Sequence, residues 1–246
     1  DGHSHGLAST FPNLKSYDPA FAYELAVIVR DGIHRMYELG ENIFYYITLY
    51  NENYPMPGIP EGEGIEQGII SGAYCWRPRR GDGEHVDLLA SGSIMLQAIA
   101  AADMLEELGY SPAIWSVTSY VELVREAENC ERESRLNPLS ERRVPYVEGL
   151  FADAGGPVVA VSDYLKALPG GIARWMPDSF TVLGTDGFGL SESREDLRDH
   201  FEVSSKHIVQ AALVELYRSG KISEQEMREQ LQPLNIEPGK SNPVAR

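Results

Sequence analysis

Residues 86–108 have the sequence VDLLASGSIMLQAIAAADMLEEL, and this stretch decides the fold class. Its first five residues suit a strand, the small residues Ser91-Gly92-Ser93 suit a turn, and the alanine-rich remainder predicts a helix. The same alternation continues along the chain, with strands predicted at 113–117, 157–161 and 180–183 and helices at 121–130, 145–151, 203–219 and 223–231. This order predicts an α/β fold with a mostly parallel sheet that helices cover on both faces.

The residues upstream of this stretch predict half of a second α/β unit. Asp18 is placed to cap a helix over 19–39, where apolar residues recur at helical spacing, and the stretch 42–50 (NIFYYITLY) predicts a buried strand. Prolines and glycines then punctuate residues 55–64, which places a domain boundary there, and a short strand is expected within 68–76. If the chain stands alone, we expect this short first piece to leave some of its apolar strand and helix surface uncovered.

The charge of the chain excludes some classes of function. Lys and Arg number 21 and Asp and Glu number 37, which gives a net charge of −16. Such a surface repels phosphate backbones and anionic lipids, so we expect no nucleic acid partner and no membrane-surface role. No apolar run approaches the ~20 residues that a membrane-spanning helix needs. The two cysteines, Cys75 and Cys130, form no CxxC pair, and a reducing cytoplasm is the expected compartment.

Two histidines near the first residue are candidate functional residues. His3 and His5 flank one serine, so in an extended segment both imidazoles would face the same side. Such a pair could bind a metal, move a proton or hold an anionic group. No third ligand is near in sequence, so no metal site is predicted, and two exposed polar residues at a chain end are the simpler interpretation.

Two turns at strand ends are further candidates. Ser91-Gly92-Ser93 lies where a dinucleotide-binding fold would hold phosphate, but the GxGxxG spacing is absent, which argues against a nicotinamide dehydrogenase. The turn 184–189 (GTDGFG) follows the last predicted strand, at the edge of an α/β sheet where ligands often bind, although a structural turn is the simpler interpretation. No GxSxG, Walker A or HExxH sequence occurs, and the acidic neighbours of Cys130 discourage a thiolate.

Several longer stretches occur together in the order found in one known family. They are Asp1-Gly2-His3-Ser4-His5, Ser16-Tyr17-Asp18-Pro19-Ala20, Tyr45-Tyr46-Ile47-Thr48, Asn51-Glu52-Asn53-Tyr54, Ser116-Val117-Thr118-Ser119, Arg143-Val144-Pro145-Tyr146, 182–188, Ser193-Arg194-Glu195 and His200-Phe201-Glu202-Val203. Over essentially the whole chain they resemble the homodimeric pyruvate dehydrogenase E1 family, whose members are built like transketolase. On that map residues 1–55 resemble the C-terminal part of a pyrimidine-binding middle domain, residues 56–85 are linker and edge elements, and residues 86–246 resemble the transketolase-like C-terminal domain.

The resemblance implies that the intact protein decarboxylates pyruvate on thiamine diphosphate with Mg²⁺ and transfers the two-carbon unit to the lipoyl group of E2, a dihydrolipoyl acetyltransferase. It implies three partners: the missing N-terminal portion of E1, a second E1 subunit, and E2 with its lipoyl domain. The main thiamine and Mg²⁺ sites are expected in the missing upstream residues, so this chain alone is expected to be inactive.

The resemblance also implies roles for the two histidines. His5 matches in character the histidine of the Asp-Gly-Pro-Thr-His segment of transketolases, which faces the substrate end of the cofactor. Such a histidine could donate a hydrogen bond to developing negative charge or relay a proton. His3 stands where the relatives have proline. Both are expected to be catalytic residues of the intact enzyme.

Two other interpretations stay open. The chain, which has no Met at its start, could be a C-terminal core fragment that serves assembly and dimerisation only. It could also belong to another transketolase-like enzyme that acts on sugar phosphates. That reading needs a cluster of basic residues near the substrate, and residues 1–55 show none.

Overall fold

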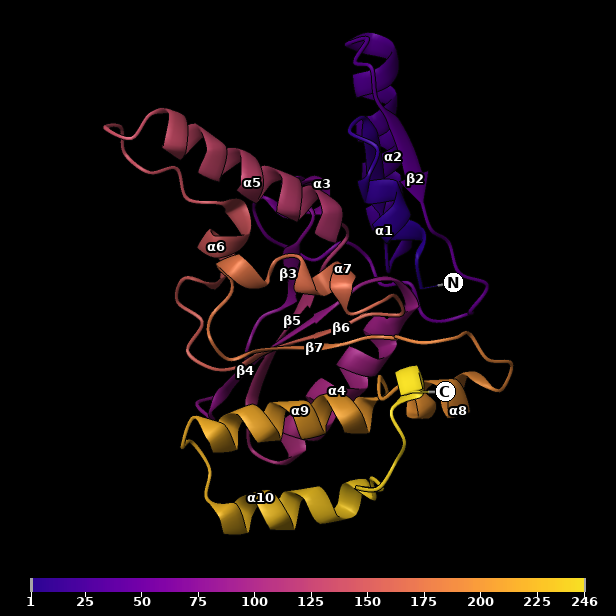
Figure 1. The fold of residues 1–246 in the computed structure, drawn as a ribbon, viewed down its shortest axis with the longest axis vertical. Helices are drawn as coiled ribbons and strands as arrows, with labels where there is room; N and C mark the ends of the chain where they lie inside the picture. The colour runs from indigo at the N-terminus through magenta and orange to yellow at the C-terminus, as the bar shows by residue number, and fades with distance from the viewer. Residues whose placement is uncertain (1, 246) are drawn as a thin grey trace.

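A five-stranded sheet forms the centre of the larger part of the molecule. The computed structural model describes residues 2–245, and within them this sheet has the strand order β3-β5-β4-β6-β7 (Figure 1). Its strands are β3 (Tyr74–Arg77), β4 (His85–Ala90), β5 (Ser111–Ser116), β6 (Val158–Val161) and β7 (Phe180–Leu183). Four of them run parallel, and only β3, at one edge, is antiparallel to its neighbour β5. The predicted α/β fold with a mostly parallel sheet is therefore confirmed.

Helices cover both faces of this sheet (Figure 1). α4 and α9 lie on one face with α10 beyond them, and α5, α6 and α7 lie on the other. Along β4, Leu88 belongs to the first core and Leu89 to the second, because successive side chains of a strand point to opposite faces. The helices of this part are α3 (Ile65–Ser71), α4 (Met95–Glu107), α5 (Tyr120–Leu136), α6 (Tyr146–Phe151), α7 (Ala167–Gly170), α8 (Arg194–His200), α9 (Ser205–Arg218) and α10 (Glu224–Leu231), with 3-10 turns at Gly92–Ile94, Ala173–Trp175, Gln232–Leu234 and Pro243–Ala245.

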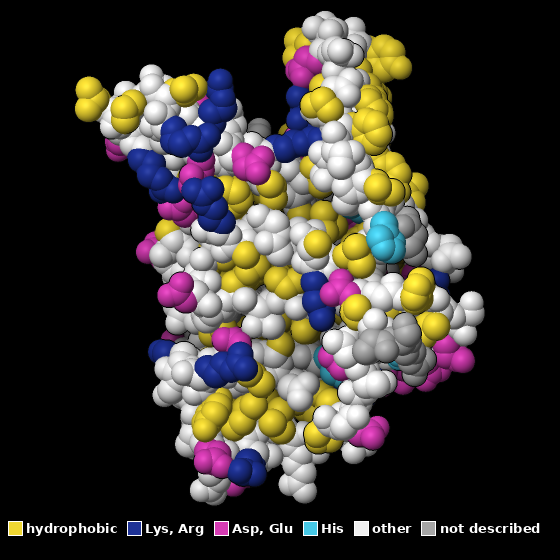
Figure 2. Space-filling view, viewed as in Figure 1, with side chains coloured by type: hydrophobic (Ala, Val, Ile, Leu, Met, Phe, Trp, Pro, Cys, Tyr) yellow, Lys and Arg dark blue, Asp and Glu magenta, His cyan; other side chains and the backbone are white. Residues whose placement is uncertain are grey.

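Residues 2–50 form a narrow arm that rises from this body (Figure 1). The arm consists of α1 (Ser4–Ser9), β1 (Leu14–Tyr17), α2 (Ala22–Ile33), a π-helical turn (His34–Glu38) and β2 (Phe44–Ile47). β1 and β2 pair in parallel, and α2 with the π-helical turn corresponds to the helix predicted over 19–39. Apolar side chains lie exposed along the arm (Figure 2), among them Leu7, Phe11, Val29, Ile33, Tyr37, Leu39, Phe44 and Leu49. The expected uncovered apolar surface is therefore present.

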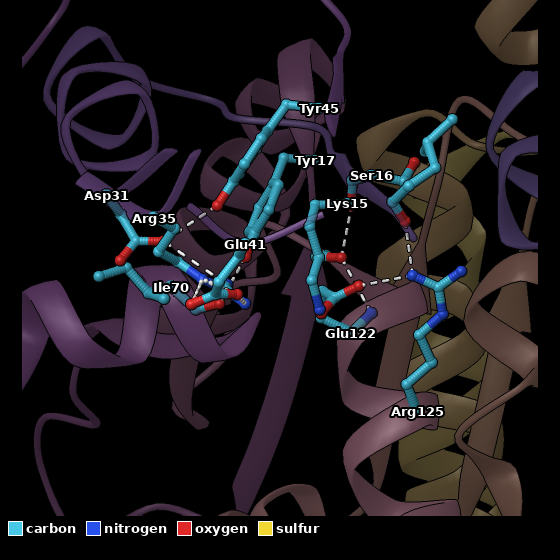
Figure 3. A network of polar contacts seen from close by, with 12 residues as sticks. Lys15, Ser16, Tyr17, Asp31, Arg35, Glu41, Tyr45, Ile70, Glu122 and Arg125 are labelled. Atoms are coloured by element: carbon cyan, nitrogen blue, oxygen red, sulfur yellow. Dashed lines mark hydrogen bonds and ion pairs between the residues drawn. The ribbon is translucent and has the colours of Figure 1, made fainter. Parts of the chain in front are cut away.

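Polar contacts hold the arm together and against α5 (Figure 3). Within the arm, Arg35 of the π-helical turn forms an ion pair with Glu41 at 2.7 Å. On β1, Lys15 pairs with Glu122 of α5, and both side chains are largely shielded from solvent. Arg125, also on α5, donates hydrogen bonds to backbone carbonyls of the arm. These contacts fix β1 beside the start of α5.

Two predicted strands differ in the structure. The segment 42–50 forms a strand only at β2, whose side chains are exposed or half-buried, so the predicted burial of this strand was wrong. The segment 68–76 begins inside α3 and becomes strand only at β3. Gly64 and Gly72 bound α3 in left-handed conformations with φ of 77° and 112°, and the helix buries Ile69 against the arm.

Asp18 does not cap the first long helix, so that prediction was wrong. α2 begins at Ala22, and the carboxylate of Glu24 accepts hydrogen bonds from the backbone N–H groups of Ala20 at 2.5 Å and Phe21 at 3.1 Å. The Asp18 carboxylate is instead occupied by three side-chain hydroxyls that come from distant parts of the chain. Glu24, four residues after Ala20, therefore provides the side-chain acceptor at the helix start that was expected from Asp18.

Glu24 also ties the arm to the sheet. Its fully buried carboxylate accepts hydrogen bonds from the hydroxyl of Tyr74 on β3 at 2.7 Å and from Ser116 on β5 at 2.6 Å. Burial raises the pKa of Glu24, and these hydrogen bonds oppose that shift. One acceptor therefore serves four donors across the junction of the arm and the sheet.

The four donors on Glu24 give a prediction for stability. Glu24→Ala leaves two hydroxyls and two backbone N–H groups without an acceptor, and we expect a loss of about 3 kcal/mol in the free energy of unfolding. Urea denaturation followed by circular dichroism measures it. Glu38→Ala, on the exposed π-helical turn, is the control and should cost less than about 0.5 kcal/mol. Equal losses in the two variants would contradict a special role of Glu24.

Candidate functional site

A cavity of about 630 Å³ lies where the arm meets the carboxyl ends of the parallel strands. Ser93, Asp163 and Thr185 line it, and they follow β4, β6 and β7 respectively. The arm contributes Gly2, His3 and residues 49–50, the segment directly after it contributes residues 51–52, and the remaining walls come from residues 187–203. Ligands of open α/β folds bind at this edge of the sheet, because the loops that leave parallel strands converge there.

The structure separates the two histidines that the sequence placed together. Residues 4–9 are helical, so the extended geometry that would let His3 and His5 face the same side is absent. His3, at the start of α1, is exposed and lines the cavity. His5 is only 2% exposed and lies behind it, in the interior of the arm. Asp1, which opens the same motif, lies outside the described residues.

Both ring nitrogens of His5 have partners. Nδ1 is 2.5 Å from the hydroxyl oxygen of Ser16, and Nε2 is 3.1 Å from the hydroxyl oxygen of Thr48. The rings of Tyr46 and Tyr164 contact the imidazole edge-on, with centroids 5.4 and 4.5 Å away. Burial lowers the pKa of His5, and the negative charge of Asp18 opposes this only in part. His5 is therefore neutral at physiological pH.

Asp18 connects the arm to the turn that follows β4. Its carboxylate accepts hydrogen bonds from the hydroxyls of Thr48 at 2.6 Å, Tyr50 at 2.7 Å and Ser91 at 2.6 Å. The backbone carbonyl of Asp18 also accepts from the N–H of Gly92 at 3.1 Å. Gly92 has a φ of 49°, and a Cβ there would lie 2.5 Å from the Tyr50 hydroxyl, so only glycine leaves room for that ring. The turn thus serves a packing role, as its small residues predicted.

Charged groups of both signs surround the cavity. Glu52 pairs with Arg198 of α8 at 2.8 Å, and Arg194 donates to the side-chain oxygen of Asn51 at 2.8 Å. Burial raises the pKa of Asp163 to about 6, although Arg198 opposes the shift. Asp163 can therefore gain or lose a proton near physiological pH, which makes it the titratable acid of this site.

The glycine-rich turn 184–189 also borders the cavity. Thr185, Gly187 and Gly189 are among its lining residues, and the Thr185 hydroxyl donates to the backbone carbonyl of Asp163 at 2.7 Å. The turn therefore both shapes the cavity wall and fixes the loop that carries Asp163. Sequence reasoning missed Asp163, although it lies two residues after a predicted strand, where functional side chains of α/β proteins often occur.

Other reactive groups contribute nothing to this site. Cys130 is buried, and burial raises the pKa of its thiol to about 11. Burial likewise raises the pKa of the Cys75 thiol to about 11.

Among residues 2–245 no group of three or more His, Cys, Asp or Glu side chains lies close enough together to hold a metal ion. None of the helices that the structure describes has the length and hydropathy to cross a membrane.

Comparison with known proteins identifies the family. Residues 1–57 match the family model of the pyruvate dehydrogenase E1 component middle domain, and residues 72–204 match that of the transketolase-like TK C-terminal domain. The chain belongs to the family of the transketolase-like TK C-terminal domain, whose model matches more than half of it. It is 47% identical over 246 residues to the pyruvate dehydrogenase E1 component of Escherichia coli strain K12, which covers 99% of this chain and 27% of the relative. The E1 component of Pseudomonas aeruginosa is 44% identical over 247 residues, with 99% and 28% covered.

Solved structures of transketolases share the fold of this chain. The transketolase from Leishmania mexicana superposes with a TM-score of 0.59 at 17% identity, over 88% of this chain and 27% of that one. A split gene transketolase, described as an inactive beta4 tetramer, gives 0.55 at 17% identity, over 88% and 61%. The chain therefore has the transketolase-like α/β fold, and it spans about a quarter of the length of the curated E1 relatives that it matches.

The raised pKa of Asp163 predicts a pH dependence of stability. Its pKa is about 6 in the folded chain and ~3.9 in an unfolded one, so its contribution is full below about pH 4 and is lost as pH rises through about 6. Asp163→Asn carries no charge into the site, and we expect it to gain about 2 kcal/mol relative to wild type between pH 4 and pH 8. Urea denaturation at the two pH values measures this difference. The exposed Asp178→Asn serves as control, and the same pH profile for Asp163→Asn and wild type would contradict the prediction.

Proposed function

We propose that this chain is the C-terminal part of a pyruvate dehydrogenase E1 subunit, and that the intact subunit decarboxylates pyruvate and reductively acetylates the lipoyl group of E2. The identity of 47% along 99% of the chain, with two family models matching in E1 order, carries this proposal. Residues 1–55 would be the end of the middle domain, residues 56–85 linker and edge elements, and residues 86–246 the C-terminal domain.

The proposed cofactor of the intact enzyme is thiamine diphosphate with Mg²⁺, and the described residues that line the cavity do not fit it. A diphosphate with its metal needs several oxygen ligands for Mg²⁺ and positive or N–H donors for the phosphates. The cavity instead presents Asp163 and Glu52, and its arginines are already engaged with Glu52 and Asn51. We therefore place the cofactor site in E1 residues outside this chain, and the chain alone should be inactive.

We propose His5 and His3 as the residues that this chain adds to the reaction centre. His3 is exposed at the cavity and can approach a ligand directly. His5 is neutral and held by Ser16 and Thr48, so it can keep a hydrogen on one defined nitrogen. A fixed hydrogen-bond donor of this kind stabilises developing negative charge without reorganisation.

The partners follow from the same proposal. They are the remainder of E1, a second E1 subunit in a homodimer, and E2 with its lipoyl domain, all in the cytoplasm. The exposed apolar side chains of the arm support the first of these, because another part of E1 would cover them.

A second function, assembly without catalysis, is favoured by one observation. His5 is 2% exposed and both its nitrogens are occupied, so it offers no free polar atom to a substrate in this conformation. In that case the chain would provide packing and dimer surface only.

Pyruvate-dependent reduction of an artificial electron acceptor, with thiamine diphosphate and Mg²⁺ added, decides between the two functions. The chain alone should show no turnover, and the chain combined with the rest of an E1 subunit should be active. In that combined preparation His5→Gln should lower turnover by about 100-fold, because an aligned donor is lost. His34→Gln, on the exposed π-helical turn, should leave turnover unchanged. Equal turnover of His5→Gln and wild type would favour assembly alone.

A further inference from the structure

A continuous line of hydrogen bonds runs through the interior of the arm. It begins at the Ser16 hydroxyl, passes through both nitrogens of His5 to the Thr48 hydroxyl, and ends at the Asp18 carboxylate. The successive distances are 2.5, 3.1 and 2.6 Å. Ser16, His5 and Asp18 are each at most 4% exposed, so water competes little for these partners. The direction of each hydrogen bond can therefore be assigned by counting hydrogens.

Asp18 is the acceptor at one end of this line of hydrogen bonds. Its carboxylate faces the hydroxyls of Thr48, Tyr50 and Ser91, each of which donates to it. Burial raises the pKa of Tyr50, and the charge of Asp18 raises it further, so this hydroxyl keeps its proton. With these three hydroxyls directed at its two oxygens, the Asp18 carboxylate is the acceptor in each contact.

Thr48 transmits this direction to His5. A hydroxyl has one hydrogen, and that of Thr48 has two acceptors within reach, the Asp18 carboxylate at 2.6 Å and the backbone carbonyl of Tyr17 at 3.3 Å, of which the shorter and charged contact is to Asp18. Only lone pairs are left for His5, whose Nε2 lies at 3.1 Å, so Nε2 must supply the hydrogen of that contact. Nδ1 of the neutral ring is then bare and accepts the hydrogen of Ser16 at 2.5 Å.

The opposite tautomer is incompatible with the same neighbours. With the hydrogen on Nδ1, the Thr48 hydroxyl would have to donate to Nε2 and would leave Asp18. That exchange would replace a charge-assisted 2.6 Å hydrogen bond by a neutral one at 3.1 Å, and a charge-assisted bond is about twice as strong. The buried carboxylate would lose one of its three donors as well.

We propose that Asp18 is a positioning residue which acts through Thr48 to hold His5 as the neutral tautomer with its hydrogen on Nε2. The rings of Tyr46 and Tyr164 pack edge-on against the imidazole and limit its rotation, so the tautomer and the orientation are fixed together. If His5 serves the reaction proposed above, a consequence that rests on that function, its Nε2–H would reach a substrate only by exchanging its contact with Thr48.

The tautomer can be observed directly in the 246-residue chain. Two-bond ¹H–¹⁵N correlation spectra of uniformly ¹⁵N-labelled protein at pH 7 distinguish the protonated from the bare ring nitrogen of each histidine. His5→Gln assigns the His5 signals by their disappearance. We expect one neutral tautomer with the hydrogen on Nε2. A hydrogen on Nδ1, or rapid averaging of both forms in the wild type, would overturn the proposal without any variant.

Paired variants test the path through Thr48. Thr48→Val removes the hydroxyl at almost constant volume and should release His5 to a mixture of tautomers, whereas Thr48→Ser should keep the Nε2–H form. Asp18→Asn should also release it, since Thr48 loses its charged acceptor. Thr118→Val is the matched control, because this buried threonine donates to the backbone of Ile69 and has no part in the line.

The positioning role of Asp18 and the proposed function can be contradicted separately. Folded Thr48→Val and Asp18→Asn proteins that both keep a pure Nε2–H tautomer would show that Asp18 does not position His5. These spectra need neither pyruvate nor a cofactor. A fixed tautomer together with an inactive E1 preparation would therefore count against the proposed function and not against the positioning role.

Discussion

The buried carboxylate of Asp18 is the constraint on which the junction of arm and body depends. An isolated charge in this position would carry a large desolvation cost, and hydroxyl donors must converge on it to offset that cost. Thr48 and Tyr50 follow β2 within the arm, and Ser91 belongs to the body, in the turn after β4. Because all three must be in place at once, the arm is fixed against the carboxyl ends of the sheet strands.

The cavity is a consequence of this attachment. Parallel strands deliver Ser93, Asp163 and Thr185 to one edge of the sheet, and the arm closes the space beside them with His3 and residues 49–50, followed by residues 51–52. Neither part would enclose it alone. The titratable acid, the ion pair of α8 and the exposed histidine thus belong to a site at an interface. Interfaces between such units are common places for ligand sites, since each unit contributes one wall.

The two histidines show how strongly local geometry decides chemical role. In an extended segment they would act as a pair, but one turn of helix sends His5 into the interior and leaves His3 at the cavity. Burial then removes the charge of His5 and gives each of its nitrogens one partner. A pair that suggested one shared function becomes one buried donor and one accessible side chain.

The sequence by itself determined the α/β alternation, the parallel sheet and the family. Strand and helix periods and small-residue turns are local signals, and the stretch 86–108 contains all three. Local signals failed where contacts between distant residues outweighed them: 68–76 became mostly helix end and loop, and Asp18 left its expected capping position for Ser91, 73 residues away. The candidate site depended on the same kind of contact. Asp163, Glu52 and Arg198 come together only when the chain is packed, because no spacing along the sequence records which strand ends and which helix will be neighbours.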